Sequence, residues 1–458
     1  MQAIVFVLRG CPAGWLGAYG NEWVATPNLD QLAAESVVFD QHFSDCPEEQ
    51  AARRAWRTGR FQFPQPTAVT SDDSGDMIAE LGRARVRTVL LRANHPETDV
   101  SGFHENWTEV IDAHPQAEDD SPLDELLRQL PQVIERLGRA SPWLLWIEID
   151  RLLPPWDVPQ HVFEVYLDED GDDDNDEGRA RPSQAEEDDA PVEGATEDED
   201  DEDDEDDEDD EDEVEEASDV EPVTPWSNPP VGPFDRQDLA AWEWLRTSFA
   251  SVVTMLDLEI GELLKLAQAG GLLDSTAIVV TSDFGWPLGE HSQVGPYRPW
   301  LHEEFVHLPL MLRLPGAEGA LRRVSALTQS VDLMPTLLEL FGVARSDRIH
   351  GRSLLPMAQG NEAAIRPYAL TGLRIEDMAE WSLRTKEWAV LLPAEGQEPL
   401  REIALYRKPE DRWEMQNVQS LHRDWAEHAR EVLKAAIQAA NPAGDVEWPL
   451  LMRPSEME

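Results

Sequence analysis

Basic residues and cysteines are scarce in this chain, and each shortage excludes a class of function. Only 37 lysines and arginines stand against 93 acids among 458 residues, so the net charge is −56. Nucleic acids and anionic membranes are both bound through fields of Lys and Arg. The charge balance therefore argues against nucleic acid and against an anionic membrane surface as partners.

The two cysteines, Cys11 and Cys46, are too few for a disulfide framework. One bridge between them remains an alternative, but the scarcity favours two separate thiols in a reducing compartment. No run approaches the roughly 20 apolar residues of a membrane span. The first residues, MQAIVFVLRG, have no basic leader, and their apolar run is too short for a signal peptide. These features predict a cytoplasmic protein.

Much of the negative charge lies in one segment, residues 168–221. It contains 34 acids and two arginines, so it supplies −32 of the −56. Like-charge repulsion and the shortage of apolar residues predict a disordered acidic insertion. Two roles remain open for it, a solvated spacer or an arm that binds basic partners or buffers cations.

Short apolar runs alternate with helical patterns along the rest of the chain. The runs lie at 3–8, 37–39, 88–91, 143–147, 277–280 and 309–312, and the helical patterns at 26–33, 50–57, 123–137, 238–268 and 331–341. This alternation predicts an α/β domain over 1–167 and 222–364, with a mostly parallel central sheet and helices on both faces.

The pattern changes near residue 365. Shorter alternating segments at 388–392 and 402–406 indicate antiparallel strands, and an amphipathic helix is expected over 421–440. A small C-terminal α+β domain is therefore predicted over 365–458. The 17 tryptophans could indicate sugar stacking, but most of them, including Trp242 and Trp244, follow helical patterns and are interpreted as core or helix-packing residues.

A carboxylate follows one of the predicted strands. Residues 277–280 lead directly into Thr281-Ser282-Asp283-Phe284-Gly285, and Gly289-Glu290-His291 comes soon after. Ligands of open α/β sheets bind at the carboxyl ends of strands. A carboxylate in that place is a natural metal ligand or general base, so the companions of Asp283 decide its chemistry.

The order of motifs resembles that of the sulfatases, in the alkaline phosphatase superfamily. The motifs are LGAYG at 16–20, TPNLDQLAAESVVF at 26–39, TGRF at 58–61, PPWDVP at 154–159, TSDFGWPLGEH at 281–291, EEFVHLPLMLRLPG at 303–316, SVDLMPTLLELFGV at 330–343, GRSLLP at 351–356 and ALYRKPEDRWEMQNV at 404–418. Each is weak alone, but nine in this order imply the sulfatase fold for nearly the whole chain outside the acidic insertion.

The resemblance also implies a chemistry, and this chain departs from it. In that family two acids at the end of the first strand, an Asp and a neighbouring Asn or His hold a calcium-type cation. Here the paired acids correspond to Arg9 and Gly10, and the neighbour of the retained Asp283 is Phe284. Of four metal ligands only Asp283 remains, as a vestigial ligand. No metal or other cofactor is therefore expected.

The family's nucleophile is a Cys or Ser, oxidised to formylglycine within a C/S-x-P-S-R motif. It corresponds here to Glu49, and the Arg of the motif remains as Arg53. Cys46 lies three residues too early and is interpreted as a packed thiol. Other family positions are altered too: the Pro and Ser of the motif become Ala51 and Ala52, the lysine-x-histidine pair becomes Ala93 and His95, a mid-chain histidine becomes Leu153, and a later lysine becomes Arg298.

A buried lone carboxylate is costly unless it is paired. We therefore expect the Arg9 guanidinium to occupy the vacated cation position and to pair with Asp283, Glu49 or both. The alternative is that Arg9 reaches solvent and Asp283 caps a helix.

The predicted residual pocket comprises Arg9, Glu49, Arg53, His95, Asp283, His291 and Arg298. Its arginines would allow an anionic ligand to bind without a metal. For each histidine a purely structural role is an equal alternative.

Three functions follow from these observations. The leading one is a catalytically inactive pseudo-sulfatase that acts in binding or scaffolding. The first alternative is an active hydrolase of sulfuric or phosphoric esters with a rearranged site, and only this alternative implies calcium. The second is an acidic interaction protein that binds basic partners through residues 168–221.

Overall fold

The computed structural model describes residues 1–63, 75–92, 103–113, 122–138, 142–167, 223–345, 349–394, 402–440 and 449–452. The predicted acidic insertion and His95 lie outside these ranges.

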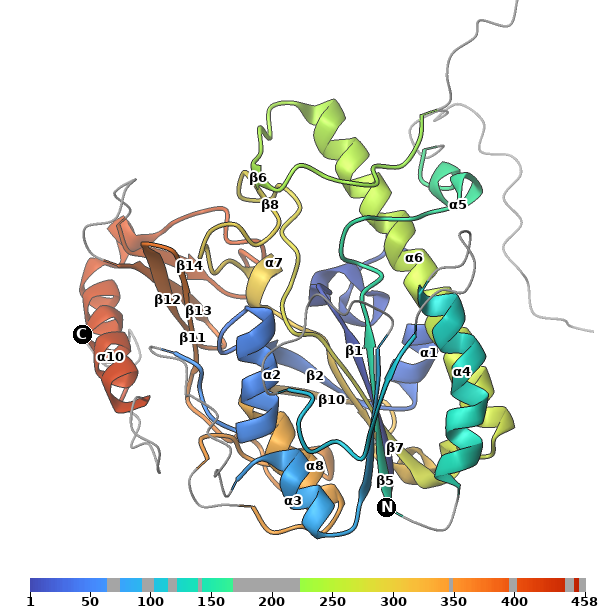
Figure 1. The fold of residues 1–458 in the computed structure, drawn as a ribbon. Coiled ribbons are helices and arrows are strands. Elements are labelled where there is room, and N and C mark those ends of the chain that lie inside the picture. Colours follow the sequence, from blue (N-terminus) through green and yellow to red (C-terminus); the bar gives the residue numbers. More distant parts are fainter. Residues whose placement is uncertain are drawn as a thin grey trace, which may run out of the picture.

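The described residues form an eight-stranded central sheet in the order β10-β2-β9-β7-β1-β5-β3-β4 (Figure 1). Its strands are β1 (Gln2–Leu8), β2 (Val37–Phe43), β3 (Arg87–Arg92), β4 (Glu109–Asp112), β5 (Trp143–Ile149), β7 (Thr276–Thr281), β9 (Leu310–Arg313) and β10 (Arg322–Gln329). Only β9 runs antiparallel to its neighbours, β2 and β7, among the pairs in this sheet. The sheet is mostly parallel, as predicted.

The central strand β1 shows why this sheet is covered on both faces. All seven of its residues are buried. Ile4, Phe6 and Leu8 belong to the core on one face, and the alternate residues Val5 and Val7 belong to the core on the other. A strand that is apolar at every position must have both faces covered, which is typical of parallel sheets.

Helices pack on each face of the sheet, as Figure 1 shows. One face carries α1 (Pro27–Ala34), α4 (Pro122–Leu137) and α6 (Leu239–Ala269). The other carries α2 (Glu49–Thr58), α3 (Met77–Arg83) and α8 (Leu333–Leu340). The predicted layers are therefore confirmed, and Gly270 is the C-cap of α6.

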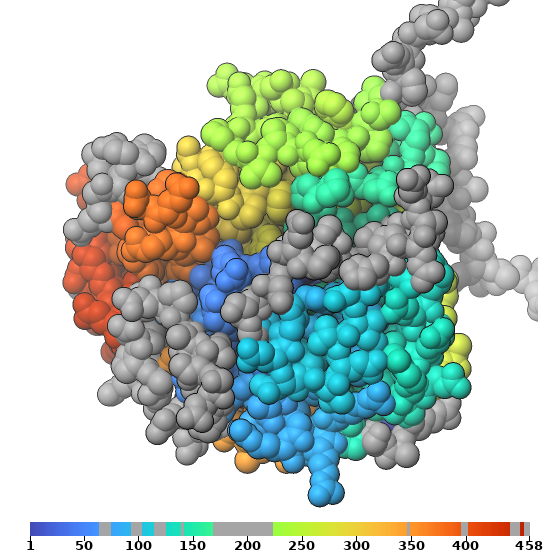
Figure 2. All heavy atoms as spheres, viewed as in Figure 1, coloured from blue at the N-terminus to red at the C-terminus, as the bar shows by residue number. Residues whose placement is uncertain are grey.

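The C-terminal part forms a second, antiparallel sheet of four strands, and its core also includes Ala55, Phe61, Phe63 and Val331 of the central domain. Its strands are β11 (Ala369–Ile375), β12 (Met378–Arg384), β13 (Trp388–Pro393) and β14 (Ala404–Arg407), and α10 (Arg423–Ala440) packs on it. In the space-filling view these orange-to-red residues form one flank of the molecule, and the lime residues that begin α6 form the top (Figure 2). The small C-terminal α+β domain is therefore present.

The start of α1 is capped by a residue of another helix. Thr26 stands at the N-cap but makes no capping hydrogen bond, because its hydroxyl accepts from the Gly17 N–H. The free N–H groups of Asn28 and Leu29 donate instead to the Asp257 carboxylate on α6, at 3.1 and 2.7 Å. A residue more than 200 positions away thus caps the helix.

Replacing that distant cap should destabilise the fold. We expect Asp257→Ala to lower the free energy of unfolding by about 2 kcal/mol, the upper range for a lost N-cap. Asp257→Asn, which keeps one acceptor oxygen, should lose less. Urea denaturation measures both, with the exposed Asp274→Ala as the control. Equal stability of Asp257→Ala and the control would contradict the tertiary cap.

Candidate functional site

The site lies where three parallel strands end side by side. Register pairs Leu8 of β1 with Ile149 of β5, and Val7 of β1 with Thr281 of β7. The residues that follow these strands therefore meet at one edge of the sheet. They include Arg9 after β1, Asp150 after β5 and Asp283 after β7.

The Arg9 guanidinium lies among three carboxylates. Its Nε is 3.2 Å from Asp283 Oδ2, its Nη1 is 2.9 Å from Asp150 Oδ1, and its Nη2 is 2.7 Å from Glu49 Oε2. The Arg9 side chain is only 5% exposed. The predicted pairing of Arg9 with both Asp283 and Glu49 is confirmed, and the alternative in which Arg9 reaches solvent is wrong.

The second oxygen of Asp283 holds the backbone of the adjoining loops. Oδ1 accepts hydrogen bonds from the N–H groups of Gly10 and Phe284, both at 3.0 Å. Gly10 has φ +76°, and a Cβ there would lie 2.7 Å from Leu153 Cδ2, so glycine is required at this turn. Asp283 is therefore occupied by one guanidinium and two backbone donors.

A second arginine extends the cluster. Arg53 on α2 binds both oxygens of Glu148 on β5, at 3.1 and 2.6 Å, and its Nη1 contacts Glu49. Glu49 therefore bridges the two guanidiniums. With all groups ionised, the four carboxylates and two guanidiniums of this cluster, which we call the Arg9 cluster, carry a net charge of −2.

The pKa shifts follow from burial and from these pairs. Burial raises the pKa of Asp283, although Arg9 and Arg53 oppose that shift. Burial would also raise the pKa of Glu148, but the attraction of Arg53 outweighs it and the pKa is lowered. Burial would lower the pKa of Arg9, yet the surrounding carboxylates raise it above its ordinary value. Arg9 is thus a permanent cation at this edge of the sheet.

The Arg9 cluster does not fit the calcium-type cation that the resemblance implies. Hard cations require several oxygen ligands directed at one point. Here a guanidinium occupies the space between Glu49, Asp150 and Asp283. In the described part of the chain, no group of three or more His, Cys, Asp or Glu side chains is arranged to hold a metal ion.

Two further residues of the predicted pocket lie elsewhere. His291 Nδ1 is 2.7 Å from Glu304 Oε1, and its ring stacks on His302 with 3.6 Å between ring centroids. The Arg298 guanidinium lies over the rings of Tyr297 and Trp300. Among the described residues of the predicted set, Arg9, Glu49, Arg53 and Asp283 contact one another, whereas His291 and Arg298 make their contacts elsewhere.

His291 belongs instead to an ionic network between the central domain and the C-terminal sheet. Its Nε2 is 3.2 Å from the Glu414 carbonyl, and the Glu414 carboxylate pairs with Arg384 and Lys408. Burial would lower the pKa of His291, but Glu304 outweighs it and raises the pKa to about 9. A charged histidine therefore helps to join the two domains.

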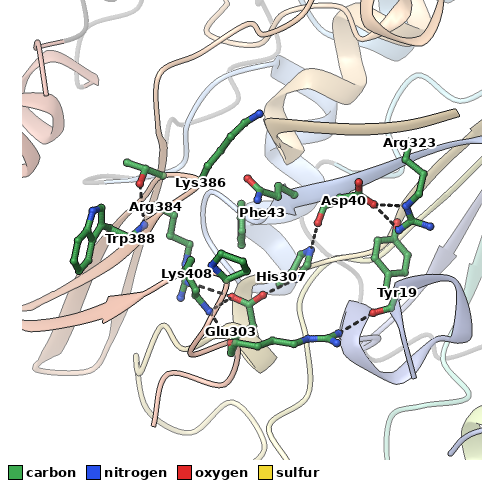
Figure 3. Close-up of a pocket in the computed structure, with 14 residues that line it drawn as sticks. Tyr19, Asp40, Phe43, Glu303, His307, Arg323, Arg384, Lys386, Trp388 and Lys408 are labelled. Atoms are coloured by element: carbon green, nitrogen blue, oxygen red, sulfur yellow. Dashed lines mark hydrogen bonds and ion pairs between the residues drawn. The ribbon is translucent and has the colours of Figure 1, made fainter. Parts of the chain in front are cut away.

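A cavity of about 230 Å³ lies beside this network (Figure 3). Figure 3 shows Glu303 between Lys408 and His307, at 3.0 and 2.7 Å. Arg323 pairs with Asp40 at the other end. Lys408 and Arg323 are thus neutralised within the protein. Lys386 and Arg412, in the same lining, donate instead to the Ser325 hydroxyl and the Tyr19 carbonyl.

Sequence reasoning missed Glu148 and Asp150. Both follow the apolar run at 143–147, at the end of a correctly predicted parallel strand. The rule that directed attention to Asp283 applies equally to them. The sequence pattern does not reveal the order of the strands, and it is the position of β5 next to β1 that brings these two residues to the site.

Comparisons with known proteins agree with this fold. The Sulfatase family model matches residues 171–343, and the model for the C-terminal part of N-sulphoglucosamine sulphohydrolase matches 289–438. An N-acetylglucosamine-6-O-sulfatase of Bacteroides thetaiotaomicron is 23% identical over 395 residues, covering 75% of this chain and 68% of the relative. Arylsulfatase K of Mus musculus is 29% identical over 161 residues, 33% of this chain and 29% of its own length.

Solved structures share the architecture at lower sequence identity. A phosphonate monoester hydrolase of Agrobacterium radiobacter aligns with a TM-score of 0.69 at 17% identity, covering 96% of this chain and 95% of that one. A structure in complex with its substrate D-glucosamine-2-N,6-O-disulfate aligns with the same TM-score and identity, covering 94% and 96%. At this identity the likeness concerns the fold alone.

The fold and the matches define the class of protein. The Sulfatase family model matches part of the chain, its relatives by sequence include sulfatases, and its fold is that of solved hydrolases such as the phosphonate monoester hydrolase. None of the described helices is long and apolar enough to cross a membrane.

Removing the central guanidinium should destabilise the protein. We expect Arg9→Met to lower the free energy of unfolding by about 3–5 kcal/mol, because it leaves the Asp283 carboxylate buried without its cation. The double variant Arg9→Met/Asp283→Asn should lose less than the single variant. Arg83→Met is the control, since its surface pair with Glu80 is worth under about 1 kcal/mol. A loss from Arg9→Met as small as that of the control, in urea denaturation, would contradict this role.

The raised pKa of His291 predicts a dependence on pH. Its contribution is complete below about pH 6.5 and is lost as pH rises through about 9. The free energy of unfolding should fall by about 2 kcal/mol between pH 7.5 and 9.5. Glu290 has a pKa raised to about 7 by burial and Glu304, so it titrates before this range. His291→Gln should flatten the profile, and an unchanged slope would count against the histidine.

Proposed function

We propose that this sulfatase-fold protein does not hydrolyse esters and acts in binding or scaffolding. The observation that carries the proposal is the Arg9 guanidinium among Glu49, Asp150 and Asp283. It stands where the resemblance places the paired acids of a metal site. The sulfatase relatives support the fold, and the ion pairs support the change of function.

The charges of the Arg9 cluster disfavour both the cation and the anionic ester group that the family's reaction requires. A guanidinium within 3.2 Å of each available carboxylate repels a divalent cation and occupies its place. The net charge of −2 also opposes a sulfate or phosphate group. Arg9 and Arg53 direct their donors at carboxylates of the protein, so the anionic ligand that was predicted for this pocket lacks support here.

Glu49, at the position of the family's nucleophile, is not suited to act as a nucleophile in its place. Glu49 accepts hydrogen bonds from the Arg53 and Arg9 guanidiniums at the start of α2. A carboxylate held by two cations is stabilised and is a poor nucleophile. The side chain is 24% exposed and lies on the solvent side of the Arg9 cluster, but no base contacts it among the described residues.

The two buried free thiols, Cys11 and Cys46, support residence in a reducing compartment, and cytoplasmic location is proposed on that basis. The charge of residues 168–221 supports a second binding mode, in which basic proteins associate in a salt-dependent manner. This second mode is independent of the Arg9 cluster.

Turnover assays test the main proposal. The full chain, supplied with Ca²⁺, should convert an aryl sulfate, an aryl phosphate and a phosphonate monoester no faster than buffer does. Asp283→Asn is the matched variant and should behave identically. Turnover that disappears in Asp283→Asn would establish an active hydrolase and overturn the proposal.

Calcium provides a second measurement on the same site. Millimolar Ca²⁺ should leave the melting temperature of the natural protein unchanged. Arg9→Gln leaves three carboxylates around the vacated space, so Ca²⁺ should raise the melting temperature of that variant. The control Arg9→Gln/Asp283→Asn should respond less. A shift in the natural protein equal to that in Arg9→Gln would show that the guanidinium does not replace a cation.

A further inference from the structure

A hollow lined by tryptophans and arginines lies apart from the Arg9 cluster. Its volume is about 220 Å³, and its walls come from the loop after β1, the first turns of α6, the loop at Glu290 and the loop after β14. We call it the Trp–Arg hollow. Its main walls are Trp15, Trp242 and Trp413, with Arg236 and Arg246 between them.

Arg246 lies against three indole rings. Its guanidinium carbon lies 5.1, 5.2 and 5.9 Å from the ring centroids of Trp23, Trp242 and Trp15. It makes no hydrogen bond or ion pair with the residues that the structure describes. The aromatic faces offset part of the cost of removing this cation from water but leave its N–H donors without acceptors.

Arg236 is the second free charge. Its guanidinium lies 4.7 Å from the Trp242 ring, and its Nη1 donates to the Glu290 carbonyl at 2.8 Å. No described carboxylate pairs with it. The hollow thus presents two positive charges that the protein does not neutralise.

Several buried arginines among the described residues have an acid partner within the protein. Arg57 pairs with Asp76 at 2.5 Å, and Arg313 pairs with Glu35 at 2.8 Å. In the interdomain cavity, Arg323 and Lys408 have acid partners too (Figure 3). Arg246 and Arg236 have no acid partner among the described residues and line the same hollow, so an anion supplied from outside would neutralise both.

The walls of the Trp–Arg hollow are held in place by the backbone. Trp242 Nε1 donates to the Leu288 carbonyl at 3.0 Å. Gly289 has φ +91°, and a Cβ there would lie 2.9 Å from Trp242 Cδ1. A Cβ at Gly14 would likewise lie 2.9 Å from the Trp413 ring. Two glycines therefore let the indoles approach the loops closely, which favours a preformed site.

We propose that the Trp–Arg hollow binds a small ligand that combines one flat ring face with one anionic group. The ring would lie against an indole face, and the anion would accept hydrogen bonds from Arg246 and Arg236. An aromatic acid and a sugar acid share this chemistry. The inference rests on the proposed binding function, to which it adds a site and a ligand class.

The remaining polar group is compatible with such a ligand. Glu290 lines the hollow, and its Oε2 accepts from the Leu288 N–H at 2.7 Å. Burial and the neighbouring Glu304 raise the pKa of Glu290 to about 7, which reduces its repulsion of an anion near neutrality. In either protonation state it can hydrogen-bond a ring hydroxyl.

Binding titrations on the full chain test the proposal. The probes are benzoate and glucuronate, with benzyl alcohol and methyl glucoside as their neutral counterparts, followed by tryptophan fluorescence and calorimetry. We expect one of the anions to bind at least about tenfold more tightly than its neutral counterpart, the effect of a charge-assisted hydrogen bond. Comparing benzoate with glucuronate shows whether the hollow binds an aromatic acid or a sugar acid.

Variants locate the binding. Arg246→Met keeps the apolar stem and should weaken the anion about tenfold. Trp413→Ala should weaken the preferred anion and its neutral counterpart alike, because it removes an outer wall. Arg407→Met is the control, since Arg407 also lies over an indole, that of Trp388, but outside the hollow. Unchanged affinity in Arg246→Met, or a loss in Arg407→Met of equal size, would overturn the proposal.

Two further outcomes would also overturn it. These are no binding of either anion at 10 mM, or equal binding of anions and neutral probes. The readout is independent of turnover. Ester hydrolysis lost in Asp283→Asn would therefore end the proposed non-catalytic function without affecting this measurement. Conversely, a failed titration would disprove ligand binding at the Trp–Arg hollow and would not bear on the ion pairs of the Arg9 cluster.

Discussion

The arrangement of the candidate site depends on one buried cation, the Arg9 guanidinium. It joins the ends of β1, β5 and β7 to the start of α2 through Asp150, Asp283 and Glu49. Charges removed from water in this way are stable only when their partners are present and well placed. The Asp150 and Asp283 carboxylates at the strand ends both pair with Arg9. The Gly10 N–H, which donates to Asp283, and the Arg53–Glu148 pair complete the network of buried contacts.

The same principle recurs at the junction of the two domains. Glu303 and Glu414 bind Arg384 and Lys408, and His291 is held in its charged form by Glu304. A protein with a large excess of acids thus uses most of its sheltered cations as internal counter-ions. Arg246 and Arg236 have no such acid partner among the described residues, and they lie together in one aromatic-walled hollow.

The comparison with solved hydrolases separates fold from chemistry. The architecture aligns over 96% of the chain with a phosphonate monoester hydrolase, at 17% identity. A fold can persist while its functional groups change, because the core depends on apolar packing and the site depends on a few polar side chains. The buried strands and the covering helices are retained here. The strand ends carry Arg9, Asp150 and Asp283, which is not the ligand set that the resemblance implies.

The sequence by itself predicted the two sheets, most of the central strands and the main helices, because the burial of a strand or helix leaves a local pattern of apolar residues. It did not predict β4, β10, β11, β12 or α3. It also placed Asp283 at a strand end and, through the resemblance, paired Arg9 with Asp283 and Glu49. Only the tertiary structure decided that Asp150 joins them, that Asp257 caps α1, and that His291 belongs to the domain junction. It also placed Trp242, which the sequence assigned to packing, in the wall of a hollow with Arg246. Such contacts join residues far apart in the chain, and they depend on strand order and side-chain direction, which no local pattern records.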